Sequence, residues 1–221
     1  MPRIGRIVAM GYPHHITQRG NYRHTVFIED ADYDRYLEWF EHYARKNRLV
    51  ILAYCLMPNH VHFIAIPETE YSLARTFNAC HMRYAQYFNK KRRVFGHLWQ
   101  GRFYSCVLSE SHLYAAIRYI ENNPVRARLV KNAWDWKWSS AKYHALKEKS
   151  PISIADVERF VEINDWKYYL TEIEDTHKIK EIRANTINGR PLGNDEFVAR
   201  MERIFHLRIR PMRRGRPRKI Y

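Results

Sequence analysis

Residues 57–67, with the sequence MPNHVHFIAIP, constrain the fold of this chain more than any other segment. Residues 63–66 are a continuous apolar run, which is typical of a strand covered on both faces. Pro58 and Pro67 bracket the segment, and proline is tolerated at the ends of strands but not in central ladders. Side chains two positions apart on a strand share a face, so His60 and His62 would lie side by side. The segment therefore predicts a turn and then a buried strand that presents two imidazoles.

Two imidazoles on a rigid strand can form half of a metal site, because imidazole nitrogen is a common ligand of divalent metals. They would leave positions open for another side chain, for water or for a substrate oxygen. Two polar residues at the mouth of a strand explain the same pattern without a metal, and short motifs often occur by chance. The histidine pair alone leaves both interpretations open.

The rest of the first 124 residues places this strand within a sheet. Apolar side chains recur every three or four residues from Tyr33 to Ala44 and from Leu73 to Phe88, which indicates two amphipathic helices. Residues 12–19, 49–56 and 102–108 are typical of strands, and a third helix begins at Ser109 or Ser111 and runs to about residue 122.

The resulting order, β-α-β-β-α-β and then a helix, predicts an α+β fold. It is a ferredoxin-like four-stranded antiparallel sheet with two helices on one face. In such a sheet the histidine strand pairs with the first strand, whose His15, Thr17 and Arg19 share one face. The third helix would cover the open face near the histidines. The fold alone leaves function open, because it serves many activities.

Charge divides the chain into three parts. The net charge is +15, which favours an anionic partner, and nucleic acid is the first candidate. Residues 151–202 contain 11 acidic and 7 basic side chains, whereas residues 203–221 contain 8 basic and no acidic ones. We therefore expect a basic domain over residues 1–145, a helical extension over residues 146–202 and a basic tail over residues 203–221.

The tail contains Gly-Arg-Pro-Arg-Lys at residues 215–219. This stretch is similar to the core of an AT-hook, an extended arm whose arginines enter a narrow minor groove. Arg214, Arg216 and Arg218 are therefore candidate DNA contacts. A solvated tail that attracts phosphate without specificity explains the same residues.

Three cysteines, odd in number and without a C-x-x-C pair, are typical of reduced thiols in an intracellular protein. The sequence contains no apolar run long enough to span a bilayer and no signal-peptide pattern. These features favour a cytoplasmic protein, associated with the nucleoid if its partner is DNA, and we expect no membrane partner.

The third predicted helix carries a candidate nucleophile. Tyr119 flanks its apolar stripe, and Asn123 stands beside it four residues later. A phenol next to a metal can attack phosphorus, and Asn123 could supply an oxygen ligand to that metal. Pro124 disfavours a helical conformation at Asn123, so the helix should end or bend there. Simple packing is the alternative for Tyr119, since the chain has 16 tyrosines.

Several motifs in one order resemble the single-tyrosine transposases of the HUH superfamily (histidine, hydrophobic, histidine). Within them the chain is most similar to the REP-associated tyrosine transposases, which are insertion-sequence-200-like. The matching segments are residues 57–62 (MPNHVH), 15–21 (HITQRGN), 97–103 (HLWQGRF), 118–127 (RYIENNPVRA), 189–193 (GRPLG) and 215–219 (GRPRK). The resemblance covers essentially the whole chain and is tightest over residues 12–143.

The resemblance implies a chemistry and a substrate. Tyr119 would attack single-stranded DNA and form a covalent 5′-phosphotyrosine, while His60, His62 and Asn123 bind Mg²⁺ or Mn²⁺. The substrates would be palindromic repeats that fold into hairpins beside a guide tetranucleotide. Arg19, Lys90, Lys91, Arg92, Arg93 and Arg102 are further candidate DNA contacts. Relatives of this kind include both monomers and homodimers, so the oligomeric state stays open.

Three other interpretations remain. A catalytically idle relative that only binds DNA or RNA hairpins would share the basic surface and tail. A replication-initiation nuclease would cut by the same chemistry, but it would normally be joined to further domains. A zinc hydrolase would use His60, His62 and a carboxylate or Cys55, and it would act without a covalent protein–DNA adduct.

Overall fold

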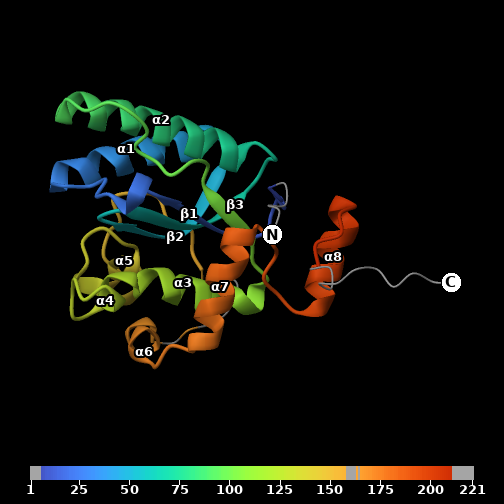
Figure 1. The fold of residues 1–221 in the computed structure, drawn as a ribbon. Helices are drawn as coiled ribbons and strands as arrows, with labels where there is room; N and C mark the ends of the chain where they lie inside the picture. The colour runs from blue at the N-terminus through green and yellow to red at the C-terminus, as the bar shows by residue number, and fades with distance from the viewer. Residues whose placement is uncertain (1–5, 158–162, 164, 211–221) are drawn as a thin grey trace.

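The computed structural model describes residues 6–157, 163 and 165–210 (Figure 1). Its centre is a four-stranded antiparallel sheet with the strand order β2-β3-β1-β4. The strands are β1 (His14–Arg19), β2 (Leu49–Met57), β3 (His60–Pro67) and β4 (Tyr104–Val107). The predicted α+β fold is confirmed, and β1 and β3 are the central pair as expected.

Helices form a layer on each face of the sheet, as Figure 1 shows. One layer consists of α1 (Asp30–Lys46) and α2 (Ser72–Arg92). The other is built around α3 (Glu110–Glu121) and α7 (Thr176–Asn188). The shorter elements are η1 (Asn21–Arg23), α4 (Asn123–Arg126), η2 (Ala133–Asp135), α5 (Ala141–Leu146), α6 (Trp166–Thr171) and α8 (Asp195–Phe205).

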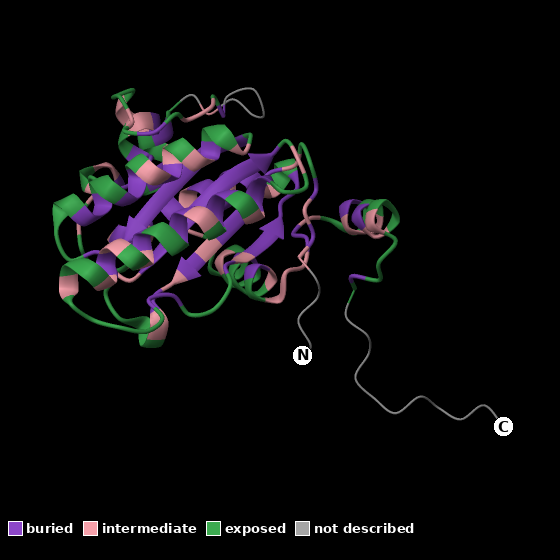
Figure 2. Cartoon of the chain, turned by 90° about the horizontal axis from the view of Figure 1, so that it is seen from above, coloured by how far each residue is buried: buried purple, intermediate pink, exposed green. Residues whose placement is uncertain are grey.

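Strand β3 separates two hydrophobic cores, and all eight of its residues are buried (Figure 2). Phe63 points towards α1 and α2, where its ring stacks on Phe40 at 3.9 Å between centroids. Ile64 belongs to the opposite core, together with Leu113 and Ile117 of α3. Burial on both sides explains why the apolar run of this strand does not alternate.

The ends of the elements differ from the predictions by a few residues. Strand β1 begins at His14 rather than at residue 12, because Gly11 adopts a φ of +77° in a preceding turn. Helix α1 begins at Asp30, three residues before the first apolar position of its predicted repeat, and Glu29 is its N-cap. Asp32 is the third helical residue, and its carboxylate accepts from the backbone N–H groups of Ile28 and Glu29.

The segment after residue 145 packs back onto the sheet domain. Helix α7 lies against β4 and α3, and its Ile182 and Thr186 are buried. Helix α8 inserts Phe197 and Met201 into a small core with Ile7 and Val107. It ends at Phe205, inside the range expected for the tail. None of the helices in the described residues is long and apolar enough to cross a membrane.

Candidate active site

A cavity of about 460 Å³ opens between β1, β3, α3 and α7. It brings together five of the residues predicted from the sequence: His60, His62, Tyr119, Asn123 and Arg19. The antiparallel register places Thr17 opposite His62 and Arg19 opposite His60, which is why the two strands line one wall. The other wall includes side chains from α7 that the sequence did not suggest, Arg183 and Thr186.

His60 is held by its neighbour on the β2–β3 turn. Its Nδ1 lies 2.6 Å from Asn59 Oδ1, and Asn59 Nδ2 donates to the carbonyl oxygen of Arg23 at 3.1 Å. Because that second bond turns Asn59 Oδ1 towards the imidazole, His60 must donate its Nδ1–H. The Nε2 lone pair of His60 then faces the cavity, where Asn123 Nδ2 lies 3.1 Å away.

The imidazoles of His60 and His62 are nearly perpendicular, with centroids 4.9 Å apart. Burial, with the charges of Arg19, Arg126 and Arg183, lowers the pKa of His60 to about 3. Burial is also the main reason that the pKa of His62 lies well below its ordinary value, and the next cause is His60. Both rings are therefore neutral near pH 7, as histidine must be to bind a metal.

The donor set suits a hard or borderline divalent cation. His60 Nε2 and the side chain of Asn123 already converge, and a half-turn of that amide would direct its oxygen to the same point. Across residues 6–157, 163 and 165–210, no group of three His, Cys, Asp or Glu side chains could share a metal ion. Asn123, beside His60 in the same cavity, is a side chain whose amide oxygen could add to the two imidazoles.

Tyr119 projects from α3 into this cavity and is 5% exposed. Its ring meets His62 edge-on at 5.8 Å between centroids. Arg183 Nε donates to the phenolic oxygen at 3.2 Å, and the guanidinium of Arg126 lies 4.5 Å from the ring centroid. Arg126 is held in place by both carboxylate oxygens of Glu174, at 2.7 Å each. Arg183 therefore contacts the phenolic oxygen, whereas Arg126, paired with Glu174, lies over the ring.

Arg183, Glu174 and Thr186 all belong to the extension and were missed by reasoning from the sequence. One signal was present: Ile179, Ile182 and Thr186 repeat at three and four residues, the spacing of a buried helical face. Arg183 adjoins that face. The pattern identifies the side of α7 that packs on the core, but not the strand that it meets.

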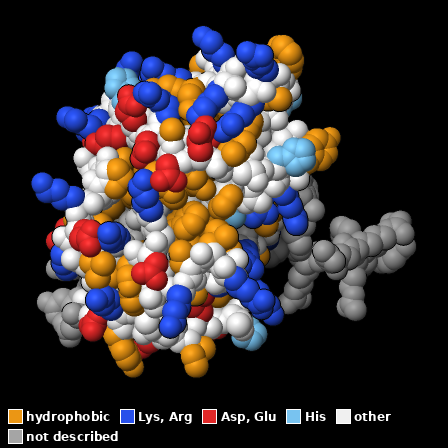
Figure 3. Space-filling model, turned by 90° about the vertical axis from the view of Figure 1, so that its left-hand side faces the viewer, with side chains coloured by type: hydrophobic (Ala, Val, Ile, Leu, Met, Phe, Trp, Pro, Cys, Tyr) orange, Lys and Arg blue, Asp and Glu red, His pale blue; other side chains and the backbone are white. Residues whose placement is uncertain are grey.

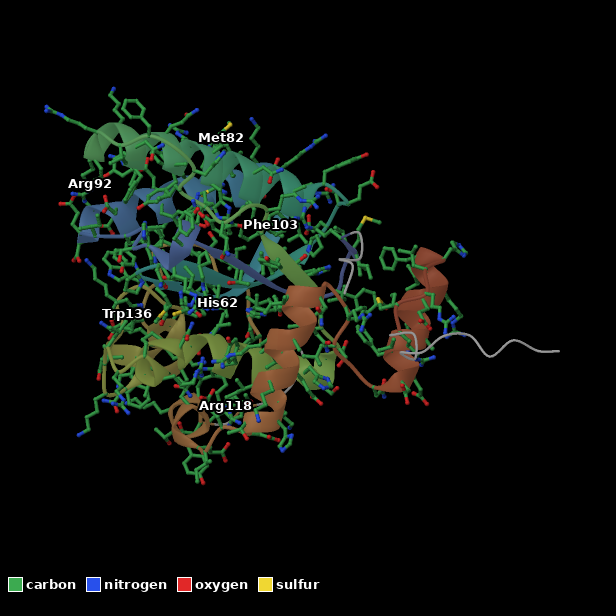
Figure 4. All side chains as sticks on the ribbon, viewed as in Figure 1. His62, Met82, Arg92, Phe103, Arg118 and Trp136 are labelled. Atoms are coloured by element: carbon green, nitrogen blue, oxygen red, sulfur yellow. The ribbon has the colours of Figure 1, made fainter. Side chains whose placement is uncertain are left out.

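The predicted DNA contacts outside the cavity lie apart from it. Arg102 is exposed in the loop before β4, beside a groove between that loop and α2. The end of α2 carries the predicted contacts Lys90, Lys91, Arg92 and Arg93. Figure 4 shows Arg92 at the outer edge of the α1–α2 layer, away from His62 on the central sheet. Arg214, Arg216 and Arg218 lie outside the described residues.

Lys91 and Arg92 already have acidic partners. The buried carboxylate of Asp32 accepts from Lys91 Nζ at 2.9 Å and from Arg92 at 3.2 Å, and Glu29 pairs with both cations. Figure 3 shows acidic and basic side chains intermixed on this end of the molecule. A role of Lys91 and Arg92 in DNA binding stays a prediction, and their ion pairs within the fold compete with it.

Residues 9–123 match the family model described as "Transposase IS200 like", which covers more than half of the chain. The chain therefore belongs to the IS200-like transposase family. A structure of a REP-associated tyrosine transposase bound to a REP hairpin is similar in fold, with 21% identity and a TM-score of 0.53. That match covers 71% of this chain and 93% of the other.

A crystal structure of a candidate transposase from Deinococcus radiodurans R1 matches less well. It is 21% identical, with a TM-score of 0.39 over 55% of this chain and 97% of the other. No curated protein matched the sequence.

Proposed function

We propose that this transposase cleaves and rejoins single-stranded DNA at hairpins of palindromic repeats, with Tyr119 as the nucleophile. One observation carries the proposal. The phenolic oxygen of Tyr119 receives a hydrogen bond from Arg183 in a cavity that also holds two neutral imidazoles and Asn123. A nucleophile, a ligand set and cationic side chains in one concave site suit attack on a phosphodiester.

The reaction exchanges one phosphate ester for another. Tyr119 Oη forms a bond to phosphorus, and the bond from phosphorus to the 3′ oxygen breaks. The phenol gives up its proton, and the departing 3′ oxygen takes one up to become a hydroxyl. The product is a 5′-phosphotyrosine, and attack by a 3′-hydroxyl on it reverses the step. Because one ester replaces another, rejoining needs no external energy source.

His60, His62 and Asn123 are proposed to hold Mg²⁺ or Mn²⁺, which would supply a Lewis acid for the scissile phosphate. The side chains around them act directly on charge. Arg183 stabilises the phenolate of Tyr119 by donating to its oxygen. Arg19 and Arg126 add positive charge near the histidines, where a phosphate would lie. Burial is the main cause that keeps both imidazoles neutral and able to bind a metal, and these cations add to it.

The proposed substrate is a DNA hairpin with a guide tetranucleotide beside it. The structurally similar REP-associated transposase was determined with a REP hairpin, and the net charge of +15 suits a polyanion. Among the predicted contacts, Arg19 lies nearest the chemistry because it lines the same cavity as Tyr119. The cytoplasm, with association to the nucleoid, is the proposed location.

The test incubates the protein with labelled single-stranded hairpin DNA from repeats beside its own gene, with Mg²⁺ or Mn²⁺, and resolves the products on a denaturing gel. Tyr119→Phe is the test variant. Tyr114→Phe is the matched control, because it also removes a phenolic hydroxyl from α3. The hydroxyl of Tyr114 donates to the carbonyl oxygen of Val157 and does not line the cavity. We expect a protein-linked label that requires metal, survives Tyr114→Phe and is absent from Tyr119→Phe.

Two results would contradict the proposal in different ways. Tight hairpin binding without any adduct would identify a catalytically idle binding protein. Cleavage that persists in Tyr119→Phe would instead indicate attack by water at a metal site, as in a hydrolase.

A further inference from the structure

The deepest polar groups of the cavity form a chain of hydrogen bonds from His62 to helix α7. His62 Nδ1 lies 2.8 Å from His15 Nε2, and His15 Nδ1 lies 2.7 Å from Thr186 Oγ1. Thr186 Oγ1 donates to the carbonyl oxygen of Ile182 at 2.7 Å. His15, Thr186 and Ile182 are each 1% exposed and His62 is 4% exposed, so bulk water does not compete for these groups.

The hydroxyl proton of Thr186 determines which group donates and which accepts in each of these hydrogen bonds. A carbonyl oxygen can only accept, so the one hydroxyl proton points to Ile182. Thr186 Oγ1 is then an acceptor for the Nδ1–H of His15. The thiol of Cys106, 3.3 Å from the same oxygen, fits this direction. Burial raises the pKa of that thiol to about 12, so it keeps its proton and can donate.

The same direction passes through His15 to His62. His15 is buried, and its hydrogen-bond partners are a hydroxyl and an imidazole with no carboxylate to balance a charge, so its ring is neutral and carries a single N–H, at Nδ1. Its Nε2 must accept, which requires His62 to donate from Nδ1. A neutral imidazole that donates from Nδ1 has its lone pair on Nε2. His60 has the same tautomer through a different partner, Asn59.

We propose that His15 and Thr186 are positioning residues that fix the Nδ1–H tautomer of His62 and thereby present its Nε2 lone pair to a divalent cation. The inference rests on the proposed function, in which His62 is a metal ligand. It assigns a role to the extension, because Thr186 lies on α7, 171 residues from His15. Groups behind a metal-binding histidine commonly set its tautomer, and their loss typically lowers metal affinity 10- to 100-fold.

The direct test determines the tautomer of His62 in the metal-free protein by long-range ¹H–¹⁵N NMR of the imidazole rings. We expect the Nδ1–H form in the wild-type protein. Thr186→Val keeps the shape of the side chain but removes the acceptor for His15. His15 can then carry its proton on Nε2, which would drive His62 to the Nε2–H form. Thr186→Ser should restore the wild-type spectrum, and Thr176→Val is the control at an exposed position of the same helix.

The second measurement is the affinity for Mn²⁺, followed by electron paramagnetic resonance. We expect Thr186→Val and His15→Phe to bind Mn²⁺ 10- to 100-fold more weakly, while His15→Gln, which retains an acceptor for His62, binds more tightly than His15→Phe. The two positions test the same hydrogen-bond chain, so one unfolded variant does not remove the test.

Three results would overturn the inference: an Nε2–H tautomer of His62 in the wild-type protein, Mn²⁺ affinities of the variants within twofold of wild type, or weaker Mn²⁺ binding with an unchanged tautomer. The tautomer is measured without metal or DNA. Failure of the inference is therefore distinguishable from failure of the tyrosine mechanism.

Discussion

Arg183 is the side chain whose charge most directly meets the proposed nucleophile, since its Nε lies 3.2 Å from the oxygen of Tyr119. Arg183→Met would keep most of the aliphatic stem and remove the donor. We expect the rate of adduct formation to fall about 10²- to 10³-fold, the usual effect of losing one donor to a reacting oxygen. Hairpin affinity should change much less.

Single-turnover cleavage with saturating protein separates these two effects. Arg200→Met is the control, because it removes the same charge from an exposed position on α8. An equal loss of rate in both variants would show that only the net charge matters, and would remove Arg183 from the site.

At this scale, the sequence reveals residues whose spacing is local. His60 and His62 are two positions apart, and Tyr119 and Asn123 are four apart, so strand and helix periodicity place each pair on one face. Arg183 meets Tyr119 across 64 residues, and no local pattern encodes that contact. His15 illustrates both cases. The sequence predicted the face of β1 on which it lies, but it did not predict its distant hydrogen-bond partner Thr186.

At the scale of elements, the end of α3 is anchored by a buried carboxylate two residues after Tyr119. Glu121 is fully buried, lies 2.7 Å from His144 Nδ1 and accepts from Trp166 Nε1 at 2.9 Å. Ser140 donates to the same carboxylate. One side chain thus connects α3 to α5 and α6.

We expect Glu121→Ala to lower the free energy of unfolding by about 3–5 kcal/mol, because it leaves several buried donors without an acceptor. Glu121→Gln should cost less, since its amide oxygen still accepts from Trp166. Urea denaturation followed by tryptophan fluorescence measures both. A loss under 1 kcal/mol in Glu121→Ala would mean that this network does not hold the helix end.

Helices α1 to α3 follow from their helical periodicity, because each buries one face against the sheet, and β3 follows from its continuous apolar run, because helices cover both of its faces. Their ends were less predictable. The cap of α1 depends on whether Glu29 or Asp30 leaves helical geometry, and the sequence offers several suitable acidic residues there. The packing of α7 on β4 and α3 depends on contacts between distant segments, which periodicity does not define.

For the whole molecule, buried neutral histidines should make stability depend on pH. Burial lowers the pKa of His14 to about 4 and that of His81 to about 3. In the unfolded chain both titrate near 6.5. Between these values the unfolded state binds more protons than the folded state, so stability rises with pH.

Below pH 6.5 each of these histidines should lower the free energy of unfolding by about 1.4 kcal/mol per pH unit. Urea denaturation of the metal-free protein at pH 7.5 and 5.5 measures this loss. His81→Gln should reduce the dependence by one proton, with the exposed His177→Gln as the control. A dependence unchanged in His81→Gln would show that His81 is protonated in the folded protein.

The oligomeric state, which the sequence left open, bears on which chain supplies the nucleophile. Tyr119 here faces His62 of its own chain, and α3 packs on β2 and β3 of that chain. We therefore expect that mixing Tyr119→Phe with His60→Ala will not restore the adduct. Recovery of the adduct in the mixture would show that two copies exchange the helix that carries the tyrosine.

The separation in sequence between β1 and α7 also determines when the complete site can form during synthesis of the chain. A ribosome releases the chain from its N-terminus, so His15, His60, His62 and Tyr119 emerge well before Arg183 and Thr186. The strands and α3 can assemble while α7 is still being made. An unfinished chain on the ribosome would thus carry the proposed nucleophile without Arg183, which donates to its oxygen, and without Thr186, which is proposed to orient His62 through His15. The proposed cutting of DNA should therefore be much slower in an unfinished chain than in one translated beyond α7.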